Sequence, residues 1–413
     1  MNTEALAAGL CRPEFPILER QVNGRPLVYL DNTATSQTPR CVVNAVEASY
    51  YGHKANVHRG VHTLSQEATD LQEKSRRRIS EWLGAASSDE IIFTRGTTEG
   101  LNLVAASFGP LALSEDKCLV LTEMEHHANI VPWQLLQSRL KFDIEVVRIR
   151  PDGSLDMEQL RNTLATKRVG IVSVCHASNV LGTINPIAEI ASAAHAAGAY
   201  IVVDGAQAVP HLRVNVAELG ADFYAFSAHK MYGPQGIGVL YGRRDLLEKM
   251  PPWQGGGEMI SSVSFEHTDF AELPFKFEAG TPDFVGIAAM PAAIDFIART
   301  DIRRIEAHEK ALYDHVCRRI ATEMSGVDIY GTAPAKSAIL SFNLRGAHHY
   351  DVGLLLDKLG VAVRTGHHCA QPLMRTLGIE GCVRASFALY NTLGEADTFV
   401  DALKRVQSML VSH

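Results

Sequence analysis

Short hydrophobic runs, each about as long as a buried strand, recur between residues 90 and 240 of this chain. Segments in which apolar residues have helical spacing separate these runs. The pattern predicts strands over 90–94, 118–122, 144–149, 169–174, 199–203, 222–226 and 236–240. It predicts helices over 39–51, 64–83, 97–108, 129–140, 156–165 and 187–197. This alternation is typical of an α/β fold, in which helices cover both faces of a mainly parallel sheet.

The pattern changes at both ends of the chain. After about residue 286, helices are predicted over 286–298, 301–324, 350–359 and 393–411, with strands over 338–343, 361–364 and 384–388. Near the start, a short apolar run over 27–30 ends at Asp31. We therefore predict an arm over 1–24 that packs with the small domain, a large domain over 25–290 and a small α+β domain over 291–413.

Composition narrows the classes of protein that this chain can belong to. The 413 residues are 46% hydrophobic and 21% charged, which is enough to bury a normal core. The net charge of -7 argues against a nucleic-acid-binding protein, which is usually basic. No apolar run approaches the roughly 20 residues that span a membrane, and the N-terminus does not resemble a signal peptide. We therefore expect a cytoplasmic protein with no nucleic-acid or membrane partner.

The seven cysteines include no CxxC pair, so they form neither a disulfide framework nor a zinc site with recognisable spacing. No metal is expected. Six of these cysteines are interpreted as ordinary thiols, and Cys369 is considered separately below.

Two neighbouring strands of the predicted sheet end in chemically distinctive residues. The run over 199–203 ends in Asp204, and the run over 222–226 is followed by Ser227, His229 and Lys230. Ligands of α/β sheets bind at the carboxyl ends of the strands. A lysine and an acid at that edge suit pyridoxal phosphate (PLP), which needs a lysine for covalent attachment and an acidic partner for its ring nitrogen.

Other strand ends supply groups that fit the same ligand. Thr97 and Thr98 open a helix and can bind phosphate, although an ordinary helix cap explains them equally well. His126 can lie on the cofactor ring and transfer protons, although a metal site or an ordinary loop is an alternative. Asn179 and Gln207 can donate hydrogen bonds to the ring's phenolic oxygen. Each signal is weak alone, but together they point to one ligand.

At this point the sequence resembles a known family. The segments 204–207 (DGAQ) and 227–234 (SAHKMYGP) resemble those of class V, fold-type I PLP enzymes. The segments 56–60 (NVHRG), 125–129 (EHHAN) and 364–373 (RTGHHCAQPL) narrow the resemblance to type II cysteine desulfurases of the SUF-system kind. The resemblance runs from about residue 14 to the C-terminus.

The resemblance implies a fold and a cofactor site. The fold would be a large domain with a mainly parallel seven-stranded sheet and a smaller α+β C-terminal domain. Lys230 would bind PLP covalently, Asp204 would pair with the ring nitrogen and His126 would stack on the ring. Phosphate would be bound by Thr97, Thr98, Ser227 and His229. Thr281 would reach the phosphate in the partner subunit, which implies a homodimer.

The resemblance also implies a substrate site and a reaction. Arg384 would bind the α-carboxylate of L-cysteine. Without the resemblance, an arginine in an ordinary surface ion pair is an open interpretation. Cys369 would be the nucleophile. Without the resemblance, a structural thiol and a metal ligand are open alternatives for this residue. Further residues would line the entrance or contact substrate: Arg364, His58, Arg59 and Asn179.

The implied reaction converts L-cysteine to L-alanine and leaves a persulfide on Cys369. Lys230 and His126 would move protons, and the sulfur would pass to a SufE-like or scaffold acceptor for iron–sulfur cluster assembly. The loop over 363–373 is compact, which suggests a poorly accessible persulfide and slow turnover without the acceptor.

The sequence alone leaves several alternative functions open. Selenocysteine lyase activity is expected as a side reaction, and a kynureninase-like hydrolase or a small-substrate aminotransferase are alternatives. Cys369 favours a desulfurase over an aminotransferase, because transamination needs no thiol. A non-enzymatic scaffold is a further alternative, against which the intact set of Lys230, Asp204 and His126 argues.

Overall fold

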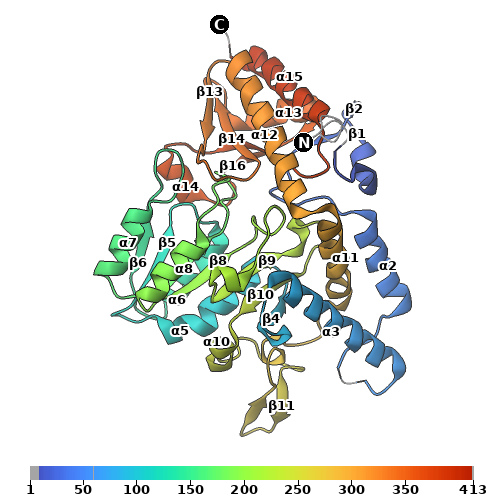
Figure 1. The fold of residues 1–413 in the computed structure, drawn as a ribbon, viewed down its shortest axis with the longest axis vertical. Coiled ribbons are helices and arrows are strands. Elements are labelled where there is room, and N and C mark those ends of the chain that lie inside the picture. Colours follow the sequence, from blue (N-terminus) through green and yellow to red (C-terminus); the bar gives the residue numbers. More distant parts are fainter. Residues whose placement is uncertain (1–8, 59, 412–413) are drawn as a thin grey trace.

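The computed structural model describes residues 9–58 and 60–411. Its largest element is a seven-stranded sheet with the strand order β4-β10-β9-β8-β7-β5-β6 (Figure 1). β10 is antiparallel to both of its neighbours, and the other pairs are parallel. The predicted mainly parallel seven-stranded sheet is thus confirmed. The strands are β4 (Ile91–Thr94), β5 (Cys118–Thr122), β6 (Ile144–Val147), β7 (Val169–Cys175), β8 (Tyr200–Asp204), β9 (Phe223–Ser227) and β10 (Gly238–Gly242).

Helices cover both faces of this sheet, because successive side chains of a strand point to opposite faces. In β8, Ile201 and Val203 join one hydrophobic core, and Val202 joins the other. The first core is shared with α3 (Thr63–Leu83), α7 (Met157–Thr166), α8 (Ile187–Ala196), α9 (Val216–Leu219) and α11 (Phe284–Thr300). The second is shared with α4 (Thr97–Leu103), α5 (Gly109–Ala112), α6 (Val131–Gln137) and α10 (Arg244–Lys249). α2 (Arg40–Gly52) packs on α11.

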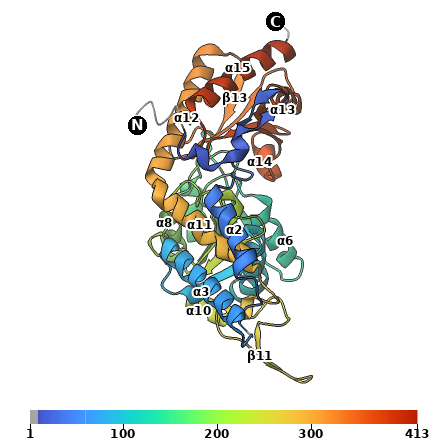
Figure 2. The same cartoon turned by 90° about the vertical axis from the view of Figure 1, so that its right-hand side faces the viewer.

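A second, smaller sheet lies beyond the large sheet, at one end of the long axis of the molecule (Figure 2). It is antiparallel, with the order β13-β14-β17-β16. Its strands are β13 (Val327–Tyr330), β14 (Ile339–Leu344), β16 (Arg364–Gly366) and β17 (Cys382–Ser386). A separate hydrophobic core joins this sheet to the helices α12 (Ile302–Glu323), α13 (His349–Lys358) and α15 (Leu393–Leu410). The short helix α14 (Gln371–Thr376) follows β16.

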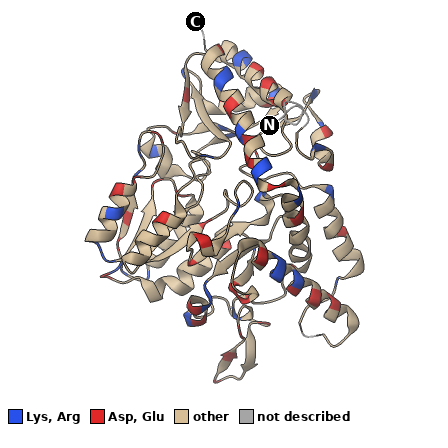
Figure 3. Cartoon of the chain, viewed as in Figure 1, with Lys and Arg blue, Asp and Glu red and all other residues tan. Residues whose placement is uncertain are grey.

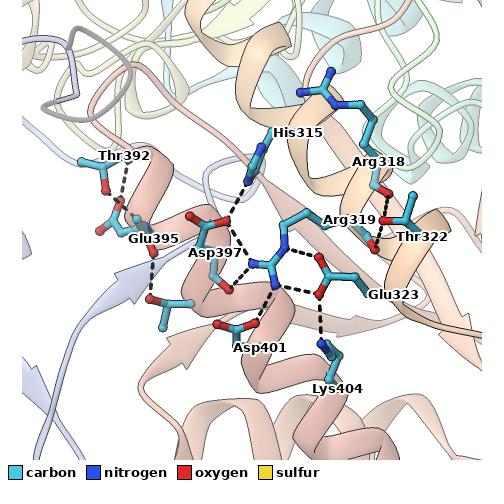
Figure 4. A network of polar contacts seen from close by, with 12 residues as sticks. His315, Arg318, Arg319, Thr322, Glu323, Thr392, Glu395, Asp397, Asp401 and Lys404 are labelled. Carbon is cyan, nitrogen blue, oxygen red and sulfur yellow. Dashed lines mark hydrogen bonds and ion pairs between the residues drawn. The ribbon is translucent and has the colours of Figure 1, made fainter. Parts of the chain in front are cut away.

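Charged residues of both signs are interspersed over the ribbon (Figure 3). A network of ion pairs joins α12 to α15 (Figure 4). Arg319 reaches Glu323, Asp397 and Asp401 at 2.7–2.9 Å, and His315 lies 2.7 Å from Asp397. Such a network fixes how the two long helices of this end pack on each other.

The N-terminal segment runs along the smaller sheet. β3 (Val28–Tyr29) pairs in parallel with β15 (Val361–Ala362), and the Leu10 N–H donates to the Leu389 carbonyl at 2.7 Å. Arg12 forms an ion pair with Glu395 at 2.9 Å. These contacts support our proposal that the arm belongs with the C-terminal domain. Residue 290, where we place the domain boundary, lies inside α11, so this division remains a proposal.

Several element ends differ from the sequence prediction. The helix predicted over 97–108 is α4, which continues as a π-helical turn over Val104–Phe108. The helix predicted over 129–140 begins at Val131, after a 3-10 turn over His127–Asn129. A hairpin of β11 (Ile260–Val263) and β12 (Thr268–Phe270) projects at the edge of the sheet domain, and a small one joins β1 (Gln21–Val22) to β2 (Arg25–Pro26). Among the described residues no helix is long and apolar enough to cross a membrane.

Candidate active site

A cavity of about 270 Å³ lies between the carboxyl ends of the large sheet's strands and the smaller sheet. Polar groups from six segments of the large domain, at 33–34, 97–98, 126–128, 175–179, 204–207 and 227–230, meet residues of the C-terminal domain there. Most of the predicted site residues line this cavity: Thr97, Thr98, His126, Asn179, Asp204, Gln207, Ser227, His229, Lys230, Arg364, Cys369 and Arg384. The structure therefore brings together groups that are up to 287 residues apart in sequence, from Thr97 to Arg384.

Two predicted site residues that the structure describes, His58 and Thr281, do not line this cavity. His58 lies against α3, where its ring nitrogen is 3.0 Å from Gln72 Nε2. Thr281 lines a different cavity of about 310 Å³, beside Arg95 and Glu99. Arg59 lies outside the described residues.

Asp204 and Lys230 occupy the ends of neighbouring parallel strands. Asp204 is the buried last residue of β8, and its Oδ1 accepts a hydrogen bond from the Ala206 N–H at 3.0 Å. Burial raises its pKa, and the positive charge of Lys230 partly opposes that shift. Lys230 ends the 3-10 turn after β9, and burial lowers its pKa. A lowered pKa increases the neutral, nucleophilic fraction of the amine.

Hydroxyl groups gather at the start of α4. The Thr97 N–H donates to Ser227 Oγ at 2.8 Å, and the two side-chain oxygens are also 2.8 Å apart. Gly96 precedes them with φ of 145°, and a Cβ there would approach Ser227 Oγ to 3.0 Å. His229 Nδ1 lies 3.2 Å from Thr35 Oγ1. Hydroxyls and N–H groups at the beginning of a helix are suitable donors for a phosphate.

His126 is held as a neutral imidazole. Its Nδ1 accepts a hydrogen bond from the Ala128 N–H at 3.0 Å, which places the ring proton on Nε2. Burial, with the nearby charge of Lys230, lowers its pKa to about 4. At neutral pH the ring therefore carries no charge, and its Nε2–H can donate a hydrogen bond into the cavity.

Glu125 is a buried carboxyl group to which the sequence analysis gave no role. It accepts hydrogen bonds from Thr122 Oγ1 at 2.6 Å, Asn129 Nδ2 at 2.7 Å and the Cys175 N–H at 3.0 Å. Burial raises its pKa to about 7. These bonds fix the loop on which His126 lies, so Glu125 positions the histidine. A carboxylate beside a predicted site histidine was the only sequence signal for it.

Cys369 lies in a short loop that the large domain holds in place. His368 and Cys369 have φ of 52° and 55°, in the left-handed region. The His127 N–H donates to the Cys369 carbonyl at 2.8 Å, and Asn179 Nδ2 donates to the His368 carbonyl at 2.7 Å. The loop is compact as predicted, yet Cys369 is exposed in the single chain. The expected shielding of its thiol is therefore wrong for this chain alone.

Two arginines line the other end of the cavity, and an aspartate behind them contacts both. Arg384 is 3% exposed, and its NH1 donates to the Asn179 carbonyl at 2.8 Å. Burial lowers its pKa to about 10, so it stays charged at neutral pH. Asp31 contacts both Arg384 and the half-exposed Arg364. The sequence analysis placed Asp31 after a strand but did not find this contact, because 333 residues separate Asp31 from Arg364.

The residues present fit PLP. The cavity combines a lysine, a buried carboxylate, a neutral histidine and a group of hydroxyls, which match the aldehyde, ring nitrogen, ring face and phosphate of that cofactor. Thr33 Oγ1 and Arg384 Nε are buried here without a hydrogen-bond partner among the described residues, so polar groups remain for a ligand. The fold and this site together define a PLP-dependent enzyme of fold type I.

Comparison with known proteins gives the family. Residues 28–399 match the aminotransferase class-V family, and the chain belongs to it. A cysteine desulfurase of Serratia proteamaculans is 48% identical over 403 residues, which cover 97% of this chain and 98% of that protein. A probable cysteine desulfurase of Halalkalibacterium halodurans is also 48% identical and covers 95% of this chain and 96% of its own length.

Solved structures agree with this placement. The cysteine desulfurase CsdA of Escherichia coli, in its S-sulfonic acid form, has a TM-score of 0.88 at 37% identity and covers 97% of this chain and 98% of its own. The apo cysteine desulfurase of Thermococcus onnurineus has a TM-score of 0.89 at 39% identity, with 95% and 97% covered. The chain is thus a homologue of the type II cysteine desulfurases, and the predicted resemblance and cofactor class are confirmed.

Proposed function

We propose that this chain is a PLP-dependent cysteine desulfurase, which converts L-cysteine to L-alanine and transfers the sulfur to Cys369. The observation that carries the proposal is that Lys230, Cys369 and Arg384 line one cavity. A lysine and an arginine suit any amino-acid substrate, whereas a thiol at the same cavity suits sulfur transfer. The near-complete coverage by cysteine desulfurases supports the same substrate.

The chain's own residues divide the work between binding and proton transfer. When bound, PLP supplies an electron sink for bond cleavage at the amino acid. Asp204 would hold its ring nitrogen and Lys230 its aldehyde carbon, with the phosphate at Thr97, Thr98, Ser227 and His229. Arg384 would bind the α-carboxylate, and Asn179 and Gln207, which line the same cavity, would donate hydrogen bonds to the phenolic oxygen of the cofactor ring.

Sulfur transfer follows from the position of Cys369. Its thiolate attacks the sulfur of L-cysteine, so that a sulfur–sulfur bond forms while the carbon–sulfur bond of the substrate breaks. The amine of Lys230 exchanges protons at the substrate's carbon atoms, and the Nε2–H of neutral His126 donates a hydrogen bond to the departing species. The products are L-alanine and a Cys369 persulfide, one of the reversible states of a reactive cysteine.

The wider role rests on the resemblance. We infer that the chain acts in the cytoplasm as a homodimer, in which Thr281 reaches the phosphate in the partner subunit. Its position in a cavity away from Lys230 supports that arrangement. By the same resemblance, His58 and Arg59 would line the entrance or contact substrate. The persulfide would pass to a SufE-like or scaffold acceptor for iron–sulfur cluster assembly, with selenocysteine lyase activity as a side reaction.

The reaction is tested by measuring alanine and sulfide released from L-cysteine, with a reductant and with or without a candidate acceptor protein. Cys369→Ala should keep its bound PLP but lose nearly all sulfide release. Cys317→Ala, which changes a partly buried thiol outside this cavity, is the matched control and should behave as wild type. Unchanged sulfide release by Cys369→Ala would place the nucleophile elsewhere, and transamination without sulfide would favour an aminotransferase.

A further inference from the structure

The loop that carries Cys369 has a backbone conformation that needs support from outside the loop. His368 and Cys369 both lie in the left-handed region, with φ of 52° and 55°. Residues with side chains rarely adopt this conformation, and they keep it only where surrounding contacts enforce it. The position of the Cys369 thiol therefore depends on the residues that hold this loop.

His127 holds the loop at two points, one on each side of Ala370. Its backbone N–H donates to the Cys369 carbonyl at 2.8 Å. Its ring Nε2 accepts a hydrogen bond at 3.1 Å from the N–H of Gln371, which is the first residue of α14. Ala370, which precedes α14, has no side-chain atom that could accept this bond. His127 thus supplies an acceptor that the loop itself lacks.

The bond to Gln371 requires a neutral ring at His127. Its donor is a backbone N–H, so Nε2 must present its lone pair and carry no proton. Partial burial, with the nearby His367, lowers the pKa of His127, which favours the neutral form. The His367 ring centroid lies 5.7 Å from that of His127, and His367 Nδ1 accepts from the Cys369 N–H at 3.1 Å. Two imidazole rings therefore accept hydrogen bonds from the backbone around the thiol.

The segment that carries His127 also carries the histidine that is predicted to stack on the cofactor ring. His126 directly precedes His127, and their ring centroids are 6.2 Å apart. Glu125 anchors the same segment to the N–H of Cys175, at the end of β7, at 3.0 Å. One short segment therefore determines how the Cys369 loop is placed relative to the cofactor site.

We propose that His127 is a positioning residue for sulfur transfer, which holds the Cys369 loop against the cofactor site through its ring Nε2. The inference deepens the proposed function and rests on it, because it concerns the attack of Cys369 on the substrate sulfur. His127 does not line the cavity, so it acts through the loop and not on the substrate. A displacement of about 1 Å in a reacting group can slow a reaction about a hundredfold. Loss of this bond should therefore lower the rate of sulfur transfer more than the affinity for L-cysteine.

The test compares two replacements of His127 that differ in their ability to accept the bond. Phenylalanine keeps a ring but has no acceptor, whereas glutamine can place its Oε1 near the position of Nε2. Alanine formed in the first turnover, before the persulfide must leave Cys369, is measured over a range of L-cysteine concentrations. We expect His127→Phe to lower the maximal rate about tenfold or more, with an unchanged half-saturating concentration and unchanged PLP content. His127→Gln should stay within about threefold of the wild-type rate, because the acceptor is restored.

A second measurement does not depend on the reaction. Amide hydrogen exchange of the resting holoenzyme should be about tenfold faster over residues 369–371 in His127→Phe than in wild type, because the Gln371 N–H loses its acceptor.

His348→Phe is the matched control for both measurements. His348 Nδ1 likewise accepts from a backbone N–H at the start of a helix, that of Tyr350 in α13 at 3.3 Å, but it lies outside the cavity. This variant should keep the wild-type first turnover and the wild-type exchange over 369–371. Thermal melting of each holoenzyme verifies that it is folded.

Three results would overturn the proposal. The first is a wild-type rate in His127→Phe, and the second is an equal loss of rate in His127→Phe and His127→Gln, which would show that the acceptor atom does not matter. The third is unchanged hydrogen exchange over 369–371 in His127→Phe. A wild type that forms no alanine from L-cysteine would instead reject the proposed reaction, and hydrogen exchange would still report on the hold of His127 on the loop.

Discussion

Burial shifts the pKa of several titratable residues that line the cavity. Loss of water disfavours the charged form, so acids rise and bases fall in pKa. Burial raises the pKa of Asp204. It lowers the pKa values of Lys230, His126 and Arg384. The outcome at neutral pH is a neutral imidazole beside a still-charged guanidinium. The imidazole can therefore donate a hydrogen bond without a charge, while the guanidinium binds a carboxylate.

Arg384→Lys should mainly weaken the binding of L-cysteine. Lysine keeps the charge but loses the planar fork that matches a carboxylate. We expect KM to rise about tenfold, which corresponds to about 1.4 kcal/mol, with a smaller change in kcat. Alanine formation is measured over a range of L-cysteine concentrations.

Arg345→Lys is the control for that experiment, because Arg345 is an exposed arginine with an aspartate partner outside the cavity. A KM for Arg384→Lys that equals the wild-type value would refute carboxylate binding by Arg384.

The role of a site residue could be predicted from the sequence where that residue directly follows a predicted strand. Asp204 and Lys230 each follow a hydrophobic run, and the topology of a parallel sheet places such ends together. Glu125 and Asp31 could not be predicted in the same way. Their partners come from distant parts of the chain, and only the folded structure determines which buried donors a carboxylate meets.

At the scale of elements, the end of β8 depends on a glycine. Gly205 follows Asp204, and its N–H donates to the Ala225 carbonyl at 2.8 Å. A Cβ at residue 205 would overlap with the ring and hydroxyl of Tyr224. That ring is fully buried, and its hydroxyl lies 3.0 Å from His176 Nδ1. The strand end and the tyrosine therefore cannot both keep their places if a side chain is added.

Gly205→Ala should lower the free energy of unfolding by about 1–3 kcal/mol, the usual cost of overpacking a core. Chemical denaturation of the apoenzyme measures this loss. Gly52→Ala, at the open end of α2, is the control and should have little effect, because no atom lies within 4 Å of the added Cβ. Equal stability of the two variants would show that the tyrosine moves aside without cost.

The types of the elements were predicted well, and their pairing less so. Runs such as β7 are buried throughout, and their hydrophobic sequence indicates a central strand. That β10 is antiparallel and lies between β4 and β9 could not be predicted, because strand order depends on contacts between distant segments. The pairing of β3 with β15 was missed for the same reason.

At the scale of the molecule, Thr281 and Lys230 of one chain line different cavities. If Thr281 serves the partner subunit, Thr281→Ala should lower PLP affinity about tenfold, because a hydrogen bond to a phosphate is lost. A mixed dimer of Thr281→Ala and Lys230→Ala chains should regain one tight site, formed by the intact Lys230 and the intact Thr281. PLP retained after gel filtration measures this.

Thr166→Ala, which removes an exposed hydroxyl at the end of α7, is the control and should retain PLP as wild type does. Failure of the mixed dimer to regain a tight site would show that Thr281 does not act across subunits.

The parallel pairing of β3 with β15 has a consequence for synthesis of the protein. Residues 28–31 emerge from the ribosome long before their partners in residues 361–386. The early segment has no partner strand while most of the large sheet is being made, although domains tend to fold as they emerge. We therefore expect that a nascent chain can assemble the lysine end of the cavity well before the arginine end. Incomplete translation products would then be unable to retain the amino acid.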